Sequence, residues 1–150
     1  MNYYYKALDL LKTTFESCQF VNTITQGLNV IDNQKKNVFP LVHINILSAS
    51  LPQGTANFRF EISVVDIRNQ SKEPVTDKFR GNDNEIDNLN TTFAIINEAV
   101  TKLRLSVDDF EFEIGELQPI LMANTNALDG WRIEIGIGFS NNELEVCCDD

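Results

Sequence analysis

A run of residues that alternates without a fault constrains the fold of this chain more than any other feature. In the run of residues 57–67, apolar and polar side chains take turns from residue 57 to residue 64: Phe58, Phe60, Ile62 and Val64 on one side, and Asn57, Arg59, Glu61 and Ser63 on the other. A period of two is typical of a strand with one buried and one solvated face. Residues 39–47 repeat the pattern, with His43 turned outward and Pro40 marking a strand start or an edge. The two runs predict an antiparallel pair.

The connection between these runs, residues 48–56, is too long for a two-residue turn. A hairpin loop of this length usually has a role beyond reversing the chain. We therefore expect Leu51 and Pro52, in its middle, to be candidates for a contact with a partner.

Two amphipathic helices are predicted. The first covers about residues 2–18, and its apolar stripe is Tyr4, Leu8, Leu11, Phe15 and Cys18. The second is clearer, and its stripe is Ile86, Leu89, Phe93, Ile96, Val100 and Leu103. Asn84 or Asp83 can cap the second helix, with acidic residues in its first turn and Lys102 and Arg104 in its last. A coiled coil is the alternative, but fewer than three heptads are present.

The remaining strands are expected at about residues 20–26, 110–114 and 130–139, with an edge strand or loop at 117–122, where Pro119 interrupts the run. The order of elements predicts one α+β domain over residues 1–150, a mainly antiparallel sheet with both helices packed on one face. Residues about 68–85 are expected to form a long flexible arm, and residues about 140–150 a mobile tail.

Composition excludes several classes of protein. The net charge of −10 disfavours general affinity for nucleic acid or anionic membrane, since phosphate contacts need clustered Lys and Arg. The acidity suits either plain solubility or a conduit that repels DNA. No run approaches the ~20 apolar residues of a membrane span, and the start of the chain lacks the pattern of a signal peptide. Three cysteines make no disulfide framework, so we expect reduced thiols in a reducing compartment.

The sequence offers little for catalysis. His43 is the only histidine, so a Ser-His-Asp or Cys-His arrangement would have to be built on it. No metal-binding spacing or phosphate-binding loop occurs, and Gly136-x-Gly138 lies inside a strand pattern. Glu111 and Glu113 share one strand face, but exposed acids that alternate with Phe are normal for a half-buried strand. We therefore predict no enzyme activity, no cofactor and no metal, and a structural or binding module instead.

Two features indicate contact surfaces. In the arm, Phe79 stands between Lys78 and Arg80, and an aromatic beside Arg is enriched at interface anchors. The alternative is that Phe79 folds back on its own core. In the last strand, Gly136 and Gly138 fall on the polar side and leave the backbone bare for a neighbouring chain, unless they merely weaken the strand.

Three short motifs resemble a known family. Residues 39–44 (Phe-Pro-Leu-Val-His-Ile), residues 79–85 (Phe-Arg-Gly-Asn-Asp-Asn-Glu) ahead of a helix, and Asp129-Gly130-Trp131 at the start of the last strand are similar to the tail terminator (tail-completion) and neck proteins of tailed bacteriophages. The likeness covers most of the chain. Phe79, Arg80 and Gly81 match the arm motif of that family, and with Arg68 and Lys78 they are the arm residues expected at subunit contacts.

The resemblance implies a structural virion protein. Such a protein is made in the host cytoplasm and assembles as a ring, usually a hexamer, that ends the tail tube and joins the tail to the head. Its partners would be its own copies, the tail-tube protein and the head–tail connector, with DNA passing through unread. A portal-adjacent adaptor and a monomeric protein-binding module stay open as alternatives, and an enzyme is a distant third.

Overall fold

The structure is a computed structural model that describes residues 2–27, 39–68, 78, 84–106, 110–123 and 127–140. Within these residues there are two helices and one sheet of six strands. The elements are α1 (Tyr3–Glu16), β1 (Thr23–Gln26), β2 (Leu41–Ser50), β3 (Thr55–Ile67), α2 (Glu85–Leu105), β4 (Glu111–Ile114), β5 (Gln118–Ala123) and β6 (Leu128–Ser140). Most of the expected arm, all of it except residues 68, 78, 84 and 85, and residues 141–150 of the expected tail lie outside this description.

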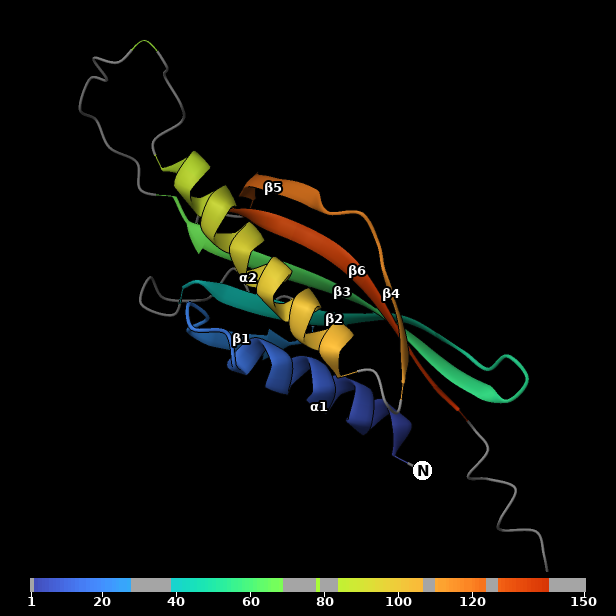
Figure 1. Cartoon of the computed structure of the whole chain (residues 1–150). Helices are drawn as coiled ribbons and strands as arrows, with labels where there is room; N and C mark the ends of the chain where they lie inside the picture. Colours follow the sequence, from blue (N-terminus) through green and yellow to red (C-terminus); the bar gives the residue numbers. More distant parts are fainter. Residues whose placement is uncertain are drawn as a thin grey trace, which may run out of the picture.

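The sheet is mixed but mostly antiparallel. Its order is β1-β2-β3-β6-β4, and β5 also pairs with β6. Only β1 runs parallel to its neighbour, whereas the other pairs are antiparallel. Both helices cover the same face, as Figure 1 shows. The α+β class and the one-sided placement of the helices predicted from the sequence are therefore confirmed.

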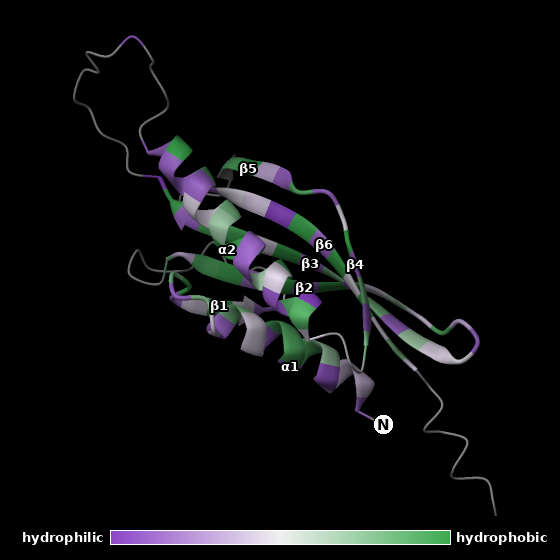
Figure 2. Cartoon of the chain, in the orientation of Figure 1, coloured by the Kyte–Doolittle hydropathy of each residue, from purple (hydrophilic) through white to green (hydrophobic). Residues whose placement is uncertain are grey.

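The centre of the sheet is the pair formed by β3 and β6, each 13 residues long. They align along their whole length, from Thr55 opposite Ser140 to Ile67 opposite Leu128. Their alternating pattern appears as successive hydrophobic and hydrophilic bands in Figure 2. Near the start of β6, a Cβ on Gly130 would lie 1.8 Å from the carbonyl oxygen of Val64, so the close approach of the two strands requires glycine there.

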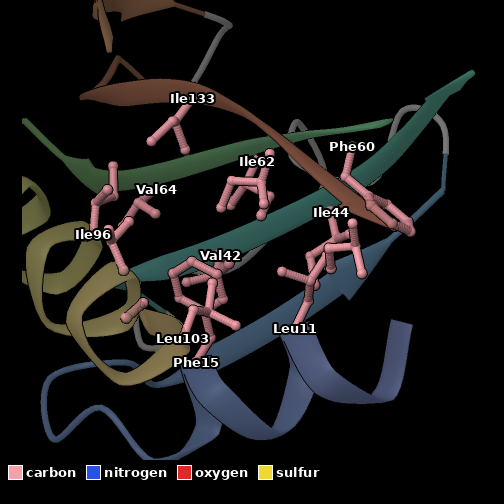
Figure 3. Close-up of a cluster of buried hydrophobic side chains, with 14 of the residues drawn as sticks. Leu11, Phe15, Val42, Ile44, Phe60, Ile62, Val64, Ile96, Leu103 and Ile133 are labelled. Carbon is pink, nitrogen blue, oxygen red and sulfur yellow. The ribbon is translucent and has the colours of Figure 1, made fainter. Parts of the chain in front are cut away.

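The hydrophobic core fills the space between the two helices and the face of the sheet that they cover (Figure 3). Its fully buried side chains come from both helices and three strands, and they include Leu11, Phe15, Ile44, Phe60, Ile62, Ile96, Leu103, Ile133 and Ile135. The side chains of β3 that alternate toward the helices are the same ones that the period of two assigned to the core. Pro40 directly precedes β2, as a strand start, and Pro119 lies in β5, which pairs only with β6.

The N-terminal half of α2 departs from its expected stripe. Ile86 and Phe93 were assigned to the core but are about half exposed, at 49% and 48%, while Asn88 and Thr92 are buried. The C-terminal half follows the stripe, with Ile96 and its successors buried. The physical reason is a set of polar partners at the start of the helix, described below, which turns Asn88 inward.

The hairpin between β2 and β3 is also tighter than expected. The strands continue to Ser50 and resume at Thr55, so the loop is residues 51–54 instead of 48–56. Gly54 has a φ of +81°, which favours glycine at the end of a tight turn. The register of β2 against β3 shifts between Ile46 and Ser48. This irregularity interrupts the alternation of polar and apolar residues, so the sequence pattern did not predict that β2 continues to Ser50.

We expect truncation of the central aromatic to weaken the fold strongly. Phe60 is fully buried between the sheet and α1, so Phe60→Ala should lower the free energy of unfolding by about 3–5 kcal/mol. Leu105→Ala is the matched control, because Leu105 is 83% exposed and its truncation should change stability by less than about 0.5 kcal/mol. Urea unfolding measures both, and equal losses would contradict this packing.

Candidate functional site

The most tightly built polar feature is a buried ion cluster where the expected arm leaves and rejoins the domain. The guanidinium of Arg68 donates from Nε to Asp129 Oδ2 at 2.8 Å and from Nη2 to Asp129 Oδ1 at 2.6 Å. The same Nη2 donates to Glu85 Oε2 at 2.7 Å. The Arg68 side chain is 7% exposed and Asp129 is fully buried. Two parallel bonds to one carboxylate give a fixed geometry that a lysine could not reproduce.

Three elements supply this cluster, and their pairing explains why it forms. Arg68 directly follows β3, Asp129 lies near the start of β6, and Glu85 opens α2. Because Ile67 pairs with Leu128 in the β3–β6 ladder, Arg68 and Asp129 meet at one end of the sheet. Asp129 shares strand parity with Trp131 and so faces the helix layer, where α2 begins.

Two asparagines complete the cluster. Asn88 donates through Nδ2 to the carbonyl oxygen of Ile67 at 3.0 Å, and Asn84 donates to the same oxygen at 3.4 Å. Asn84 occupies the cap position of α2 but makes no side-chain capping bond, so the sequence-based expectation of an asparagine cap is wrong in its detail. Its side chain contacts Ile67 and Asn88 instead. We name Arg68, Asn84, Glu85, Asn88 and Asp129 together the arm base.

A further carboxylate lies close by at the end of β3. Burial raises the pKa of Asp66, and a hydrogen bond from the backbone N–H of Ile67 to its Oδ1, at 2.8 Å, opposes that shift. Desolvation disfavours the charged form of such a group. Three acids therefore lie at the end of the sheet that holds Arg68: Asp129 is fully buried, and Asp66 and Glu85 are partly buried.

Trp131 ties α2 to β6 next to the arm base. Its indole Nε1–H donates to the carbonyl oxygen of Leu89 at 2.9 Å, and its ring meets Phe93 edge-on with centroids 5.9 Å apart. Phe93 and Ile86 are half exposed on the outer side of α2, and Leu121 of β5 is 50% exposed. The start of α2 thus presents an apolar margin to its surroundings.

The second feature is a groove on the face of the sheet that the helices leave uncovered, here called the open face. It measures about 630 Å³ and lies at the end of the sheet away from the arm base. Its lining residues are Ser48, Ser50, Asn57, Phe58, Arg59, Glu111, Phe112, Glu113, Gly136, Ile137 and Gly138. We name these residues the groove.

Charged side chains cross the open face in rows. Arg59 lies between Glu113, at 4.0 Å, and Glu134, at 3.6 Å. Arg132 forms one further pair, with its Nε 3.9 Å from Glu61 Oε1. Such solvent-exposed pairs contribute about 0–1 kcal/mol each. These side chains and Glu111 together comprise four glutamates and two arginines, so their net charge is negative.

The two glycines of β6 lie in this groove as the sequence suggested, but their surroundings differ. A Cβ at Gly136 would meet only ordinary contacts, with Glu113 Cβ at 3.7 Å. A Cβ at Gly138 would lie 2.4 Å from the side-chain oxygen of Asn57, so the close approach there comes from a side chain of the neighbouring strand. The groove is hollow because no side chain rises from either position.

The remaining predicted contact residues are spread over the molecule. Leu51 is 81% exposed and Pro52 is exposed beside it, at the tip of the β2–β3 hairpin. Lys78 is exposed. Phe79, Arg80 and Gly81 lie outside the described residues. Arg68 was expected at a contact between subunits, but its guanidinium is buried against Asp129 and Glu85 and is not exposed for such a contact.

His43 was expected on the wet side of its strand, and this is wrong, because it is only 8% exposed. Its Nδ1 is 2.7 Å from Thr25 Oγ1 on the parallel strand β1. Burial lowers its pKa, while a hydrogen bond with the backbone of Gly27 and the charge of Glu61 act in the opposite sense. Burial in β2, between β1 and β3, thus favours the neutral form of this histidine.

Cys18 is a buried free thiol beyond the end of α1. Burial raises its pKa to about 11, with Glu98 adding to the shift and Lys102 opposing it. Thiolate is the reactive form, so this group is held in its unreactive state. The other two cysteines, Cys147 and Cys148, lie outside the described residues.

Sequence reasoning missed Asp129 and Asn88 as members of a site. One signal was available for Asp129, which stands two residues before Trp131 and so shares the face that the alternation assigns to the core. A buried polar side chain needs partners, so this position indicated a polar contact. Asn88 lies off the apolar stripe expected for its helix and gave no such signal. The partners themselves come from distant segments and carry no local pattern.

In comparisons with known proteins, no family model matches the chain, and no curated protein sequence matches it either. Within the described segments, no group of three or more His, Cys, Asp or Glu residues is arranged to hold a metal ion. None of the described helices has the length and apolar character needed to cross a membrane.

We predict that breaking the arm base costs far more stability than breaking a surface pair. Arg68→Ala leaves Asp129 buried without its cation and should lower the free energy of unfolding by about 3–5 kcal/mol. Arg59→Ala is the matched control, because its two ion pairs are solvent-exposed and worth about 1 kcal/mol or less. Chemical denaturation of both variants measures the difference, and a loss at Arg68 no larger than at Arg59 would contradict the burial.

A pH dependence follows from the lowered pKa of His43. Near pH 6.5 the unfolded chain binds more protons at this residue than the folded chain does, so stability should fall as the pH drops below about 6.5. In His43→Gln that component should vanish. Melting temperatures of both proteins between pH 7.5 and pH 5.5 measure it, and parallel curves would refute it. Asp66, with its raised pKa, acts in the opposite direction at lower pH and is common to both proteins.

Proposed function

We propose that this chain is a structural virion protein of a tailed bacteriophage, a ring-forming tail terminator or neck subunit that ends the tail tube and joins the tail to the head. The observation that carries the proposal is the arm base. A connection of about sixteen residues between two elements of a compact domain is unusual and generally functional. Here its two ends are fastened together by Arg68, Glu85 and Asp129 at the end of the sheet.

This fastening supports a display role for the arm. A connection that only joined β3 to α2 would not need a buried ion cluster at its ends. Burying charged groups is costly, and it is attested mainly where a unique geometry is required. The cluster gives the arm a defined point of departure, and the arm carries the residues that match the family motif, Phe79, Arg80 and Gly81.

The rest of the surface is compatible with contacts between copies. The helices cover one face of the sheet, while the open face carries a groove and a row of charges. An arm on one surface and a groove on another would make a head-to-tail contact, and such contacts generate a ring when the rotation closes. A ring leaves no free interface.

The electrostatics suit a conduit. With a net charge of −10, a ring of several copies would have a strongly negative field. Duplex DNA could pass through such a ring without being held, because retention needs clustered cations that release counterions from phosphates. The partners in this proposal are further copies of the chain, the tail-tube protein and the head–tail connector.

A monomeric protein-binding module is the second candidate. The half-exposed Ile86 and Phe93 beside Trp131 favour it, because such an apolar margin can hold a partner without self-assembly. The two candidates differ in whether the chain contacts its own copies.

Imaging separates these candidates. We expect negative-stain images and light scattering of the purified chain to give a discrete ring, with six copies as the expected number, either alone or on isolated tail tubes. Replacing residues 70–82 with a short Gly/Ser linker should abolish the ring and keep the melting temperature within a few degrees, since the arm base is retained. A chain that stays monomeric under both conditions would overturn the proposal.

A further inference from the structure

The groove and the arm base lie at opposite ends of the sheet. The groove surrounds Asn57, Gly136 and Gly138, near the tip of the β2–β3 hairpin. The arm base joins Ile67, at the other end of β3, to the start of α2. Figure 1 shows the hairpin tip and the first turn of α2 at the two extremes of the molecule.

The groove is acidic and has bare backbone at Gly136. Glu111, Glu113 and the adjoining Glu134 surround it, and the one cation among its lining residues is Arg59, which already lies near two of these glutamates. A Cβ at Gly136 would meet only ordinary contacts, whereas the side-chain oxygen of Asn57 lies over Gly138. An occupant that matches this surface carries positive charge at its flanks and a flat apolar group between them.

One segment of the chain has that chemistry. Lys78 and Arg80 place one cation on each side of the aromatic Phe79. Residues 141–150 carry four acids and no Lys or Arg, so the acidic groove would repel them. Residues 28–38 contain the cations Lys35 and Lys36 but no aromatic side chain. Charge and shape together select the arm.

The arm cannot reach the groove of its own molecule. Asn84 is bonded to Ile67, and Phe79 precedes Asn84 by five residues, so it can lie at most about 18 Å away. Gly136 pairs with Arg59, which is eight residues from Ile67 along β3 and so about 26 Å away. The groove of a second copy can lie within this reach, because a second molecule can be placed next to the arm. The contact is therefore between molecules.

We infer that the segment Lys78-Phe79-Arg80 of one copy occupies the groove of the next copy, with the ring of Phe79 over Gly136 and the two cations beside Glu111, Glu113 and Glu134. The inference rests on the proposed ring and names the contact that closes it. Each copy gives one arm and receives one, so the interface is head-to-tail. Attraction between the charges fixes its register and speeds its formation.

Charge reversal tests the pairing. Variant A carries Lys78→Glu and Arg80→Glu, and variant B carries Glu111→Lys and Glu113→Lys. In each variant the arm and the groove bear the same sign, so the concentration for half-assembly should rise about tenfold or more. All four side chains are surface residues or lie in the arm, so melting temperatures should stay close to that of the wild type.

An equimolar mixture of A and B supplies the decisive comparison. The negative arm of A matches the positive groove of B, and the positive arm of B matches the negative groove of A. We expect the mixture to restore rings of alternating copies under the conditions in which the wild type assembles. The control variant, Lys35→Glu with Lys36→Glu, removes the same charge as A at another site and should assemble like the wild type.

The outcomes separate this inference from the proposed function. If the wild type forms rings while A and B do so equally well, or if their mixture is not restored, the pairing is wrong and the ring stands. If the control variant fails as A does, the effect is one of net charge and the pairing is again overturned. If the wild type never assembles, alone or on tail tubes, the ring itself fails and the inference falls with it.

Discussion

The guanidinium of Arg68 determines how the main parts of this molecule are joined. Its bonds to Asp129 and Glu85 bring the end of β3, the start of β6 and the first turn of α2 to one point. Once this point is set, Asn88 turns inward to satisfy the carbonyl of Ile67, and the apolar side chains Ile86 and Phe93 move outward. The outward position of these apolar side chains thus accompanies the burial of Asn88, because buried polar groups must find partners.

The two faces of the sheet contribute differently to the stability of the fold. One face excludes water under both helices and supplies the burial that stabilises the fold, at about 25 cal/mol per Å² of apolar surface. The open face carries exposed charges whose pairing contributes little to stability. These exposed charged residues can therefore change without loss of the fold, and their arrangement can serve recognition. The same face also carries a small buried cluster that does support the fold: Phe39, Leu41, Val65, Ile120 and Leu128. The groove lies where that freedom is greatest, beyond the reach of the helices.

Much of the fold was predictable from local periodicity. The alternation of β3 and β6, the spacing of α1 and the second half of α2 are each set by neighbours a few residues apart, and the structure confirms them. The errors share a physical cause. The shape of the β2–β3 turn depends on a register shift, the burial of His43 on a parallel partner strand, and the rotation of α2 on Arg68 and Asp129, all of them contacts between distant segments. For the candidate site, the glycines of the groove were visible in the pattern, whereas the arm base was not, because its members are separated by up to 61 residues.

The full-length alignment of β3 with β6 has a mechanical consequence. A pull exerted at the arm base and resisted at the hairpin end is directed along both strands. Their backbone hydrogen bonds run across that direction, so a force that enters through β3 and leaves through β6 is shared by all registered pairs from Thr55–Ser140 to Ile67–Leu128. If copies of the chain form the proposed ring, this ladder would let each copy pass tension to the next with little stretching.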